Sequence, residues 1–532
     1  MSPTSPAPAS WRRAVVLAPI VFAFLAVAVQ VLRLSATVRD EPRLAAAEPV
    51  PAAAPRPDIV DRHGRLLAAD VMAPSLFADP SLVVDPDETA DKLAAVFPDL
   101  ERGELRRALA DRTRRFVWIK RSLSPRLAQR IHDLGLPGLA FRDEPRRTYP
   151  GVRLAGHMIG YVGIDNQGLA GLERMLDHDQ RQGPLGNRGD LEPVRLSVDL
   201  GVQFGLEAEL ADAMARTGAK GASGVILDAV TGEIVAMASL PSVDPARPAE
   251  HLEPLRFNRV TGGVYELGSI MKMATVAMAL EHRIASLDTV LDVRVPLEAG
   301  RWKIVDPHPS PRPLTVREVF IHSSNVGAGM LALQAGAERQ RAFLTRLGLT
   351  DPLRLESGPV APPTLPKYWG RAETITIAYG HGMAVSPLQF AAAAATLING
   401  GFAVTPTLIA RDRPQPRMRV VSSATSEAMR DLMRRNVTSP KGTGRRAEVA
   451  GFEIGGKTGT AEIAGRGGYD EKAVISSFLA AFPMSAPRHV VLLTLFEPKG
   501  SAETGGQIAA GATAAPATGR LISRVGPLLM AR

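Results

Sequence analysis

The sequence predicts one N-terminal membrane-spanning helix and two further domains: a smaller α+β domain and a larger α/β domain whose sheet is mainly antiparallel. A chain of 532 residues is longer than a single hydrophobic core usually supports, which favours at least two domains. Residues 14–32 contain no charged side chain, and such a run can cross a hydrocarbon core of about 30 Å as a helix. The long second part of the chain contains both strand-like and helix-like patterns.

The composition is that of an ordinary globular protein, and it excludes some classes of site. The chain has no cysteine, so disulfides and thiolate metal sites are excluded. Its ten histidines lack the spacing of metal-ligand motifs, and we expect neither a metal nor a cofactor. The formal net charge of +9 could indicate nucleic-acid binding, but the arginines are dispersed without interleaved aromatic residues, and we expect no nucleic-acid partner.

The charges around the apolar run predict its orientation. Arg12 and Arg13 precede the run and no acidic residue occurs in the tail, which places residues 1–13 in the cytoplasm and the rest of the chain outside. We therefore expect a retained single-pass transmembrane anchor at residues 14–34. A cleaved signal peptide, with small residues at 35–37, and a twin-arginine export signal are the alternatives. The length of the run, and the lack of a clear cleavage site directly after it, favour the anchor.

The exported part begins with a tether and the smaller domain. Residues 35–57 are rich in alanine, proline and charge, which is typical of a linker. Residues 58–68 turn like a β-hairpin with glycine at its tip, and residues 87–134 show helical spacing. The polar, glycine-rich stretch at residues 181–190 resembles a connector, so we predict the α+β domain at residues 58–194.

The larger domain, residues 195–532, begins with a predicted helix at residues 200–215. Residues 224–228 and 233–238 are predicted to form a β-hairpin, because the turn between them ends in glycine. Further strands are predicted at residues 450–455, 472–482 and 489–496. With predicted helices among them, these elements indicate an α/β domain.

Three short motifs in this domain indicate a serine acyl-transfer site. They occur in the order Ser269-Ile-Met-Lys272, Ser323-Ser-Asn325 and Lys457-Thr-Gly459. Apolar residues follow Ser269 at helical spacing, which places this serine at a helix N-terminus with Lys272 one turn further along the same face. Each motif alone arises by chance, but their order and context together indicate a single site.

The Lys272 amine can take the Ser269 hydroxyl proton only if the amine is uncharged. A lysine in water is protonated at pH 7, so burial or a nearby cation must lower its pKa, and Lys457 could be that cation. The helix dipole and the free N–H groups at the same end favour the oxyanion that forms when a serine attacks a carbonyl. The glycine before Lys457 does not begin a phosphate-binding loop, because the spacing from an earlier glycine is wrong.

These motifs resemble those of the class B penicillin-binding proteins, especially the division-type D,D-transpeptidases. Arg147-Thr-Tyr-Pro-Gly151 and Gly168-Leu-Ala-Gly-Leu-Glu173 look like the non-catalytic pedestal of that family, and Tyr379-Gly-His-Gly-Met383 looks like part of its transpeptidase domain. The resemblance implies a penicillin-binding/serine β-lactamase-like transpeptidase fold for residues 195–532. It also implies a pedestal of the dimerisation type for residues 58–194.

The resemblance implies catalytic roles for individual residues. Ser269 is expected to be acylated by the penultimate D-Ala of a stem pentapeptide, with Lys272 as its base. Ser323 is expected to relay a proton toward the leaving amine, and Asn325 to hydrogen-bond the backbone of the acyl donor. Lys457 is expected to maintain the electrostatic field of the site.

The resemblance likewise implies a substrate-binding strand. Its expected residues are Thr458, Gly459 and Thr460. Thr458 is expected to bind the substrate carboxylate, and the backbone N–H groups of Ser269 and Thr460 are expected to form the oxyanion hole.

The implied function is the cross-linking of peptidoglycan stem pentapeptides during septal wall synthesis, with inhibition by β-lactams. The protein would lie in the inner membrane at the division site, with its catalytic domain in the periplasm. Its implied partners are a membrane glycosyltransferase of the shape, elongation, division and sporulation (SEDS) type and other divisome proteins. The alternatives are an elongation-type class B transpeptidase, a non-catalytic division scaffold, and a β-lactamase. A β-lactamase must deliver water to the acyl-enzyme, and Glu356, between the second and third motifs, is the carboxylate considered for this role.

Overall fold

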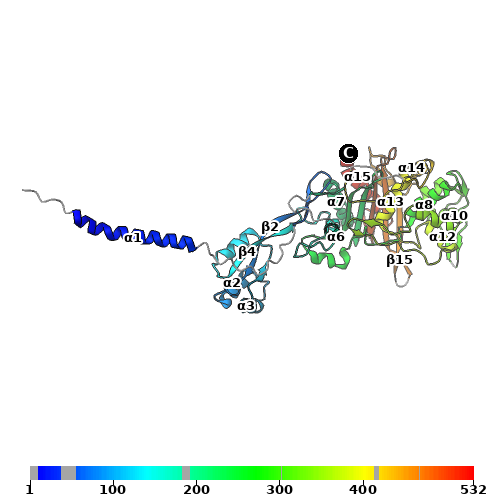
Figure 1. The fold of residues 1–532 in the computed structure, drawn as a ribbon. Coiled ribbons are helices and arrows are strands. Elements are labelled where there is room, and N and C mark those ends of the chain that lie inside the picture. The colour runs from blue at the N-terminus through cyan, green and yellow to red at the C-terminus, as the bar shows by residue number, and fades with distance from the viewer. Residues whose placement is uncertain are drawn as a thin grey trace, which may run out of the picture. The chain divides into compact units, whose positions relative to one another are not determined.

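The computed structural model describes residues 10–37, 55–182, 192–300, 302–411, 418–465 and 468–531 (Figure 1). The chain falls into two compact units. Unit 1 contains residues 73–144 together with the N-terminal residues, and unit 2 contains residues 54–72 and 145–532. The connector predicted at residues 181–190 lies almost entirely outside the described residues.

The first helix, α1 (Ser10–Thr37), contains the segment expected to be the anchor. Across the described ranges, no helix combines the length and the apolar character that crossing a membrane requires. The anchor at residues 14–34 therefore stays a prediction.

Unit 1 packs short helices against a small sheet. Its helices are α2 (Pro86–Val96), α3 (Arg102–Ala110) and α4 (Pro125–His132). The Asp85 carboxylate caps α2 by accepting hydrogen bonds from the N–H groups of Asp87 and Glu88, at 2.9 and 3.0 Å. Leu76, Leu93 and Leu109 are fully buried between the helices and the sheet.

Helices α2, α3 and α4 confirm the helical spacing of residues 87–134, but the expectation is wrong at β3 (Val117–Lys120), which pairs with residues 76–78 of β2 (Leu66–Ala78). Valine, tryptophan and isoleucine in succession favour an extended backbone. Ile119 is buried, and the Trp118 ring meets the Phe77 ring edge to face at 6.3 Å. Packing against β2 thus decides the conformation of this segment.

Unit 2 begins with the predicted hairpin. β1 (Ile59–Val60) pairs antiparallel with the start of β2, and Gly64 in the turn has a φ of +81°, which glycine adopts without strain. β1 also pairs in parallel with β5 (Val194–Arg195), so the two ends of the predicted pedestal segment meet. β4 (Leu139–Thr148) completes this sheet beside β2.

A buried ion-pair network holds this part of unit 2 together. The Glu173 carboxylate, whose side chain is fully buried, accepts from Arg56 Nε at 2.9 Å and from Arg147 Nε at 2.7 Å. Arg147 also donates to the carbonyl of Pro57 at 2.9 Å and pairs with Asp70 at 3.3 Å. Arg56 and Pro57, which the sequence places in the tether, are thereby fixed to residues 117 and 90 positions away along the chain.

The predicted α/β domain is built on a five-stranded antiparallel sheet. Its strands, in spatial order, are β14 (Gly455–Gly465), β15 (Gly468–Phe482), β16 (His489–Phe496), β6 (Gly221–Asp228) and β7 (Ile234–Leu240). The mainly antiparallel sheet and the hairpin of β6 and β7 are confirmed. The strand predicted at residues 450–455 begins instead at Gly455, so that the Lys-Thr-Gly motif lies within β14.

Helices cover both faces of this sheet, which explains why β6, β7 and β16 are buried along their whole length. Alternate residues enter different cores: Val225 and Leu227 belong to one, and Ile226 to the other. α7 (Leu200–Thr217), which matches the predicted helix, lies beside α15 (Ala514–Met530) on one face (Figure 1). α13 (Pro387–Ile398) packs on the other face with the helices that carry the serine motifs.

The remaining elements of unit 2 include eight α-helices and three two-stranded ribbons among the described residues. The helices are α5 (Gly156–Ile159), α6 (Gly171–Gln182), α8 (Lys272–Glu281), α9 (Val316–His322), α10 (Asn325–Ala335), α11 (Ala337–Arg346), α12 (Arg371–Ala378) and α14 (Ser423–Thr438). Three two-stranded ribbons pair β8 (Val290–Leu291) with β11 (Leu314–Thr315), β9 (Leu297–Ala299) with β10 (Trp302–Ile304), and β12 (Arg354–Leu355) with β13 (Gly358–Pro359).

We expect Glu173→Ala to lower the free energy of unfolding by about 3–5 kcal/mol, because it leaves two buried guanidinium groups without their shared carboxylate. Denaturant-induced unfolding of the purified protein measures this change. The same substitution at the exposed Glu338 is the matched control and should leave the unfolding midpoint near that of the wild type. Equal midpoints for the two variants would contradict a stabilising role for the network.

Candidate active site

Ser269 lies in a single 3-10 turn, Gly268–Met271, that leads into α8. The loop before it packs directly on β14, and two glycines permit this approach. A Cβ atom on Gly268, whose φ is +57°, would lie 2.4 Å from the Thr460 carbonyl oxygen, and one on Gly459 would lie 2.4 Å from the Leu267 carbonyl oxygen. The glycine of the Lys-Thr-Gly motif is therefore needed to bring the strand against the serine loop.

Lys272 is the first residue of α8, and its side chain is fully buried. The Nζ atom lies 2.7 Å from Ser269 Oγ and 2.7 Å from Asn325 Oδ1. It also lies 2.8 Å from the Ser323 carbonyl oxygen and 3.2 Å from Ser323 Oγ. The S-x-x-K spacing thus places the amine in contact with the serine hydroxyl, as predicted.

The second motif forms the turn between α9 and α10, where Ser323 has a left-handed φ of +62°. The buried carboxylate of Asp306 holds this turn. It accepts from Ser324 Oγ at 2.6 Å, from the Asn325 N–H at 2.5 Å and from the Val326 N–H at 2.9 Å. Asp306 therefore fixes the backbone that presents Ser323 and Asn325 to Lys272.

Lys457 reaches the same place from β14. Its side chain is fully buried, and its Nζ atom lies 2.9 Å from Ser323 Oγ. The Ser323 hydroxyl therefore lies between two lysine amines, and the three predicted motifs meet around it.

Burial sets the charge state of these amines. Desolvation, and then the nearby charge of Lys457, lower the pKa of Lys272 well below its usual range, whereas the Asp306 carboxylate acts in the opposite direction. Burial lowers the pKa of Lys457 to about 7. An uncharged amine can therefore stand against the Ser269 hydroxyl near neutral pH and accept its proton.

A pocket of about 340 Å³ opens onto Ser269, with Asn325 and Thr460 in its wall. Thr460 Oγ1 accepts from the Ala510 N–H at 3.1 Å. Thr458 is 7% exposed, and its hydroxyl donates to Thr443 Oγ1 at 2.7 Å, so its role in binding the substrate carboxylate stays a prediction. Gly459 serves the packing of the strand against the serine loop.

Sequence reasoning missed three residues of this site. Asp306 was not assigned to the site, because its contacts with Ser324, Asn325 and Val326 join segments that are separated along the chain. His381, from the Tyr379–Met383 motif, lies in a turn and lines the pocket, as does Glu462. The sequence does contain a signal for Glu462. Side chains two residues apart on a strand point to the same face of the sheet, so Glu462 is expected on the same face of β14 as Thr460.

The residues considered for other chemistries have structural roles. The Glu356 carboxylate accepts from the Leu408 N–H at 3.0 Å and from the Thr407 hydroxyl, and it does not line the pocket around Ser269. Within the described part of the chain, no three His, Asp or Glu side chains converge as a metal site requires. The rival β-lactamase interpretation therefore loses the carboxylate that was considered for it.

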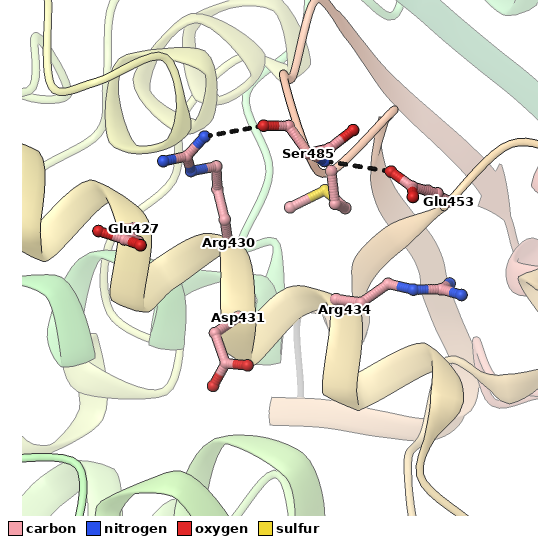
Figure 2. A pocket seen from close by; sticks show the side chains of 7 residues that line it. Glu427, Arg430, Asp431, Arg434, Glu453 and Ser485 are labelled. Atoms are coloured by element: carbon pink, nitrogen blue, oxygen red, sulfur yellow. Dashed lines mark hydrogen bonds between the residues drawn. The ribbon is translucent and has the colours of Figure 1, made fainter.

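A second pocket, of about 390 Å³, lies beside α14 (Figure 2). Figure 2 shows Arg430 and Glu453 on either side of Ser485. The Arg430 guanidinium donates to the Ser485 carbonyl at 3.4 Å, and the Ser485 N–H donates to the Glu453 carboxylate at 3.3 Å. Arg434 pairs with Glu448 at 2.6 Å. The described lining of this pocket includes none of the predicted site residues.

Comparison with known proteins agrees with this geometry. Residues 222–518 match the penicillin binding protein transpeptidase domain, and residues 51–186 match the penicillin-binding protein dimerisation domain. The chain is 40% identical over 485 residues to the probable peptidoglycan D,D-transpeptidase FtsI of Caulobacter vibrioides, an alignment that covers 89% of this chain and 81% of that protein. It is 30% identical over 480 residues to the peptidoglycan D,D-transpeptidase FtsI of Escherichia coli K12, covering 85% and 81%.

The fold is similar to that of the crystal structure of penicillin binding protein 3 from Mycobacterium tuberculosis. The TM-score is 0.69 at 24% identity, and the alignment covers 90% of this chain and 96% of that one. Since a family match spans more than half of the chain and two relatives align over most of their length, the chain belongs to the class B penicillin-binding proteins, in which a dimerisation domain precedes the transpeptidase domain.

Proposed function

We propose that this protein is a serine D,D-transpeptidase that cross-links peptidoglycan stem peptides in septal wall synthesis and is inhibited by β-lactams. The observation that carries the proposal is the contact of 2.7 Å between the buried Lys272 amine and Ser269 Oγ. The names of the relatives, peptidoglycan D,D-transpeptidases from two organisms, support the same substrate.

In the first half-reaction, Ser269 attacks the carbonyl of the penultimate D-Ala of a stem pentapeptide, and Lys272 takes the hydroxyl proton. Ser323 passes a proton to the leaving amine, supported by its hydroxyl lying 3.2 Å from Lys272 Nζ and 2.9 Å from Lys457 Nζ. Terminal D-Ala leaves, and the ester on Ser269 remains. A proton is thereby moved between groups already in contact, which lowers the barrier to nucleophilic attack.

Substrate binding is assigned to the strand edge and the helix start. Asn325 binds the donor's backbone, and Lys457 maintains the field around Ser323. The backbone N–H groups of Ser269 and Thr460 form the oxyanion hole, a role supported by the close packing of Gly268 against Thr460. Thr458 binds the substrate carboxylate if its hydroxyl turns from Thr443 toward the ligand, since the hydroxyl is now 2.7 Å from Thr443 Oγ1.

The protein acts from the inner membrane at the division site, with its catalytic domain in the periplasm. The apolar run at residues 14–32 supports a single-pass anchor, and the described side chains of Phe22, Phe24 and Leu32 in this run are exposed. Arginines before the run place residues 1–13 in the cytoplasm.

A SEDS-type membrane glycosyltransferase and other divisome proteins are the proposed partners, in keeping with the name FtsI among the relatives. Depletion of the protein separates the septal role from an elongation role, because it gives filaments in the first case and round cells in the second.

We expect Ser269→Ala to abolish covalent labelling by a fluorescent penicillin, because the Ser269 hydroxyl lies 2.7 Å from Lys272 Nζ and lines the pocket, whereas the Ser323 hydroxyl lies 3.2 Å from the same amine and is not part of the described pocket lining. Intact mass followed over hours should show a stable adduct on the wild type. Ser485→Ala, in the second pocket, is the matched control and should label normally. Unchanged labelling of Ser269→Ala would contradict the assignment of the nucleophile, and rapid loss of the wild-type adduct with drug hydrolysis would indicate a β-lactamase.

The pH dependence of acylation is expected to report on Lys272. Its uncharged form is the base, so the acylation rate falls as the pH drops through the pKa of Lys272. The Asp306 carboxylate raises that pKa, so Asp306→Asn should move the acidic limb of the profile to lower pH. Stopped-flow acylation across pH measures the midpoint, with the exposed Asp292→Asn as control. A midpoint that stays in place or rises would contradict this account.

A further inference from the structure

The turn that carries His381 is fastened to the loop that carries Ser269. A Cβ atom on Gly380, whose φ is +97°, would lie 2.0 Å from the Gly268 carbonyl oxygen, so the two loops touch through their backbones. The Gly382 N–H donates to the Glu266 carboxylate at 2.8 Å. Thr275 in α8 donates to the Ala378 carbonyl at 2.8 Å. These contacts hold the imidazole at a fixed place relative to the nucleophile.

His381 and Glu462 reach the pocket around Ser269 from different elements. His381 comes from the turn after α12, and Glu462 comes from β14, two residues beyond Thr460. Both side chains are partly exposed, so both are open to a ligand. In the described part of the chain, the Glu462 carboxylate makes no hydrogen bond or ion pair, whereas the Glu266 carboxylate accepts from the Gly382 N–H.

The charges facing His381 come from three elements. Burial, the largest influence, lowers the pKa of His381, as does the charge of Lys272 in α8. The carboxylates of Glu266, in the serine loop, and Glu462, in β14, act in the opposite direction. The imidazole is therefore uncharged at neutral pH, and the carboxylates would stabilise it once it has taken a proton.

In the second half-reaction of a transpeptidase, an amine attacks the acyl-enzyme, and a carboxylate and a neutral imidazole can both assist this attack. The acyl acceptor is a primary amine, which is protonated in water at pH 7 and cannot attack until it loses a proton. A carboxylate attracts the ammonium form, and a neutral imidazole can take its proton. Neither catalytic lysine can attract a cation, because an amine carries no negative charge in either protonation state.

We propose that Glu462 and His381 form the subsite for the acyl acceptor: the Glu462 carboxylate binds the protonated primary amine, and the His381 imidazole takes a proton from it so that the free amine can attack the ester on Ser269. This inference rests on the proposed transpeptidase function. It assigns the two ends of the reaction to different bases, Lys272 for the serine and His381 for the incoming amine.

The protons balance as follows. The ammonium group loses one proton to His381, which later releases it to solvent. The amine nitrogen then forms a bond to the ester carbonyl carbon, and loses a second proton to Lys272. As the bond between that carbon and Ser269 Oγ breaks, Lys272 returns this proton to the serine oxygen. The products are the cross-linking amide and the free serine.

The test measures how the acyl-enzyme divides between amine and water. The full-length protein is acylated by a thioester donor in the presence of glycinamide, and the amide and acid products are quantified at several pH values. Both products arise from one acyl-enzyme, so their ratio does not depend on the acylation rate. Glycolamide, which has a hydroxyl in place of the amine, is the acceptor control.

We expect His381→Asn and His381→Gln to lower the ratio of amide to acid by tenfold or more at pH 7. A general base contributes at least about 10²-fold to a rate, and the smaller expected loss allows for water partly replacing the imidazole as the base. The ratio in these variants should recover as the pH rises, because free amine then becomes available. Glu462→Gln should raise the glycinamide concentration needed for half-maximal amide formation severalfold. His132→Gln and Glu338→Gln, at exposed sites, are the matched controls.

Ratios within twofold of the wild type in both His381 variants and in Glu462→Gln would overturn the inference. A rise of the ratio in Glu462→Gln would also overturn it, because that result assigns Glu462 to the activation of water. If the wild type forms no acyl-enzyme with the thioester, the proposed function itself fails. A wild type that acylates and forms amide, with unaffected variants, refutes only the acceptor subsite.

Discussion

The site depends on the burial of two lysine amines around one serine hydroxyl. Moving an ammonium group from water into a protein interior costs on the order of several kcal/mol of solvation free energy. The cost falls if the group gives up its proton and becomes a neutral amine. Lys272 and Lys457 are both fully buried and both contact Ser323 Oγ. Their mutual repulsion and their desolvation favour at least one uncharged amine, and burial together with the charge of Lys457 lowers the pKa of Lys272, the amine against Ser269, well below its usual range.

Close backbone packing makes this burial possible. The serine loop touches β14 through Gly268 and Gly459, and it touches the turn of His381 through Gly380. Any side chain at these positions would meet a carbonyl oxygen at 2.0–2.4 Å. The sheet in turn is rigid because both of its faces are covered by helices. The polar cluster of the pedestal part, centred on Glu173, is a second buried charge network and contributes stability rather than chemistry.

Much of this arrangement could be predicted from the sequence, because its signals are local. The S-x-x-K spacing places Lys272 one turn from Ser269, apolar periodicity predicts α7, and a turn ending in glycine predicts the hairpin of β6 and β7. Asp306 and His381 could not be assigned in this way. Their roles arise from contacts with segments far along the chain. The periodic spacing of apolar residues predicts helices and strands, but it does not predict contacts between distant segments. The strand at Val117–Lys120 was missed for a related reason, since its pairing with β2 outweighs the helical pattern around it.

The charge state of Lys272 is the central claim, and a direct titration tests it. The protein is labelled with ¹⁵N at its lysine side chains, and the resonance of Lys272 Nζ is identified by its loss in Lys272→Met. The nitrogen shift is then followed across pH. We predict a midpoint well below the range of an exposed lysine, so that the amine is uncharged where acylation is fast. A midpoint in the ordinary lysine range would contradict the account, because the base beside Ser269 would then be protonated.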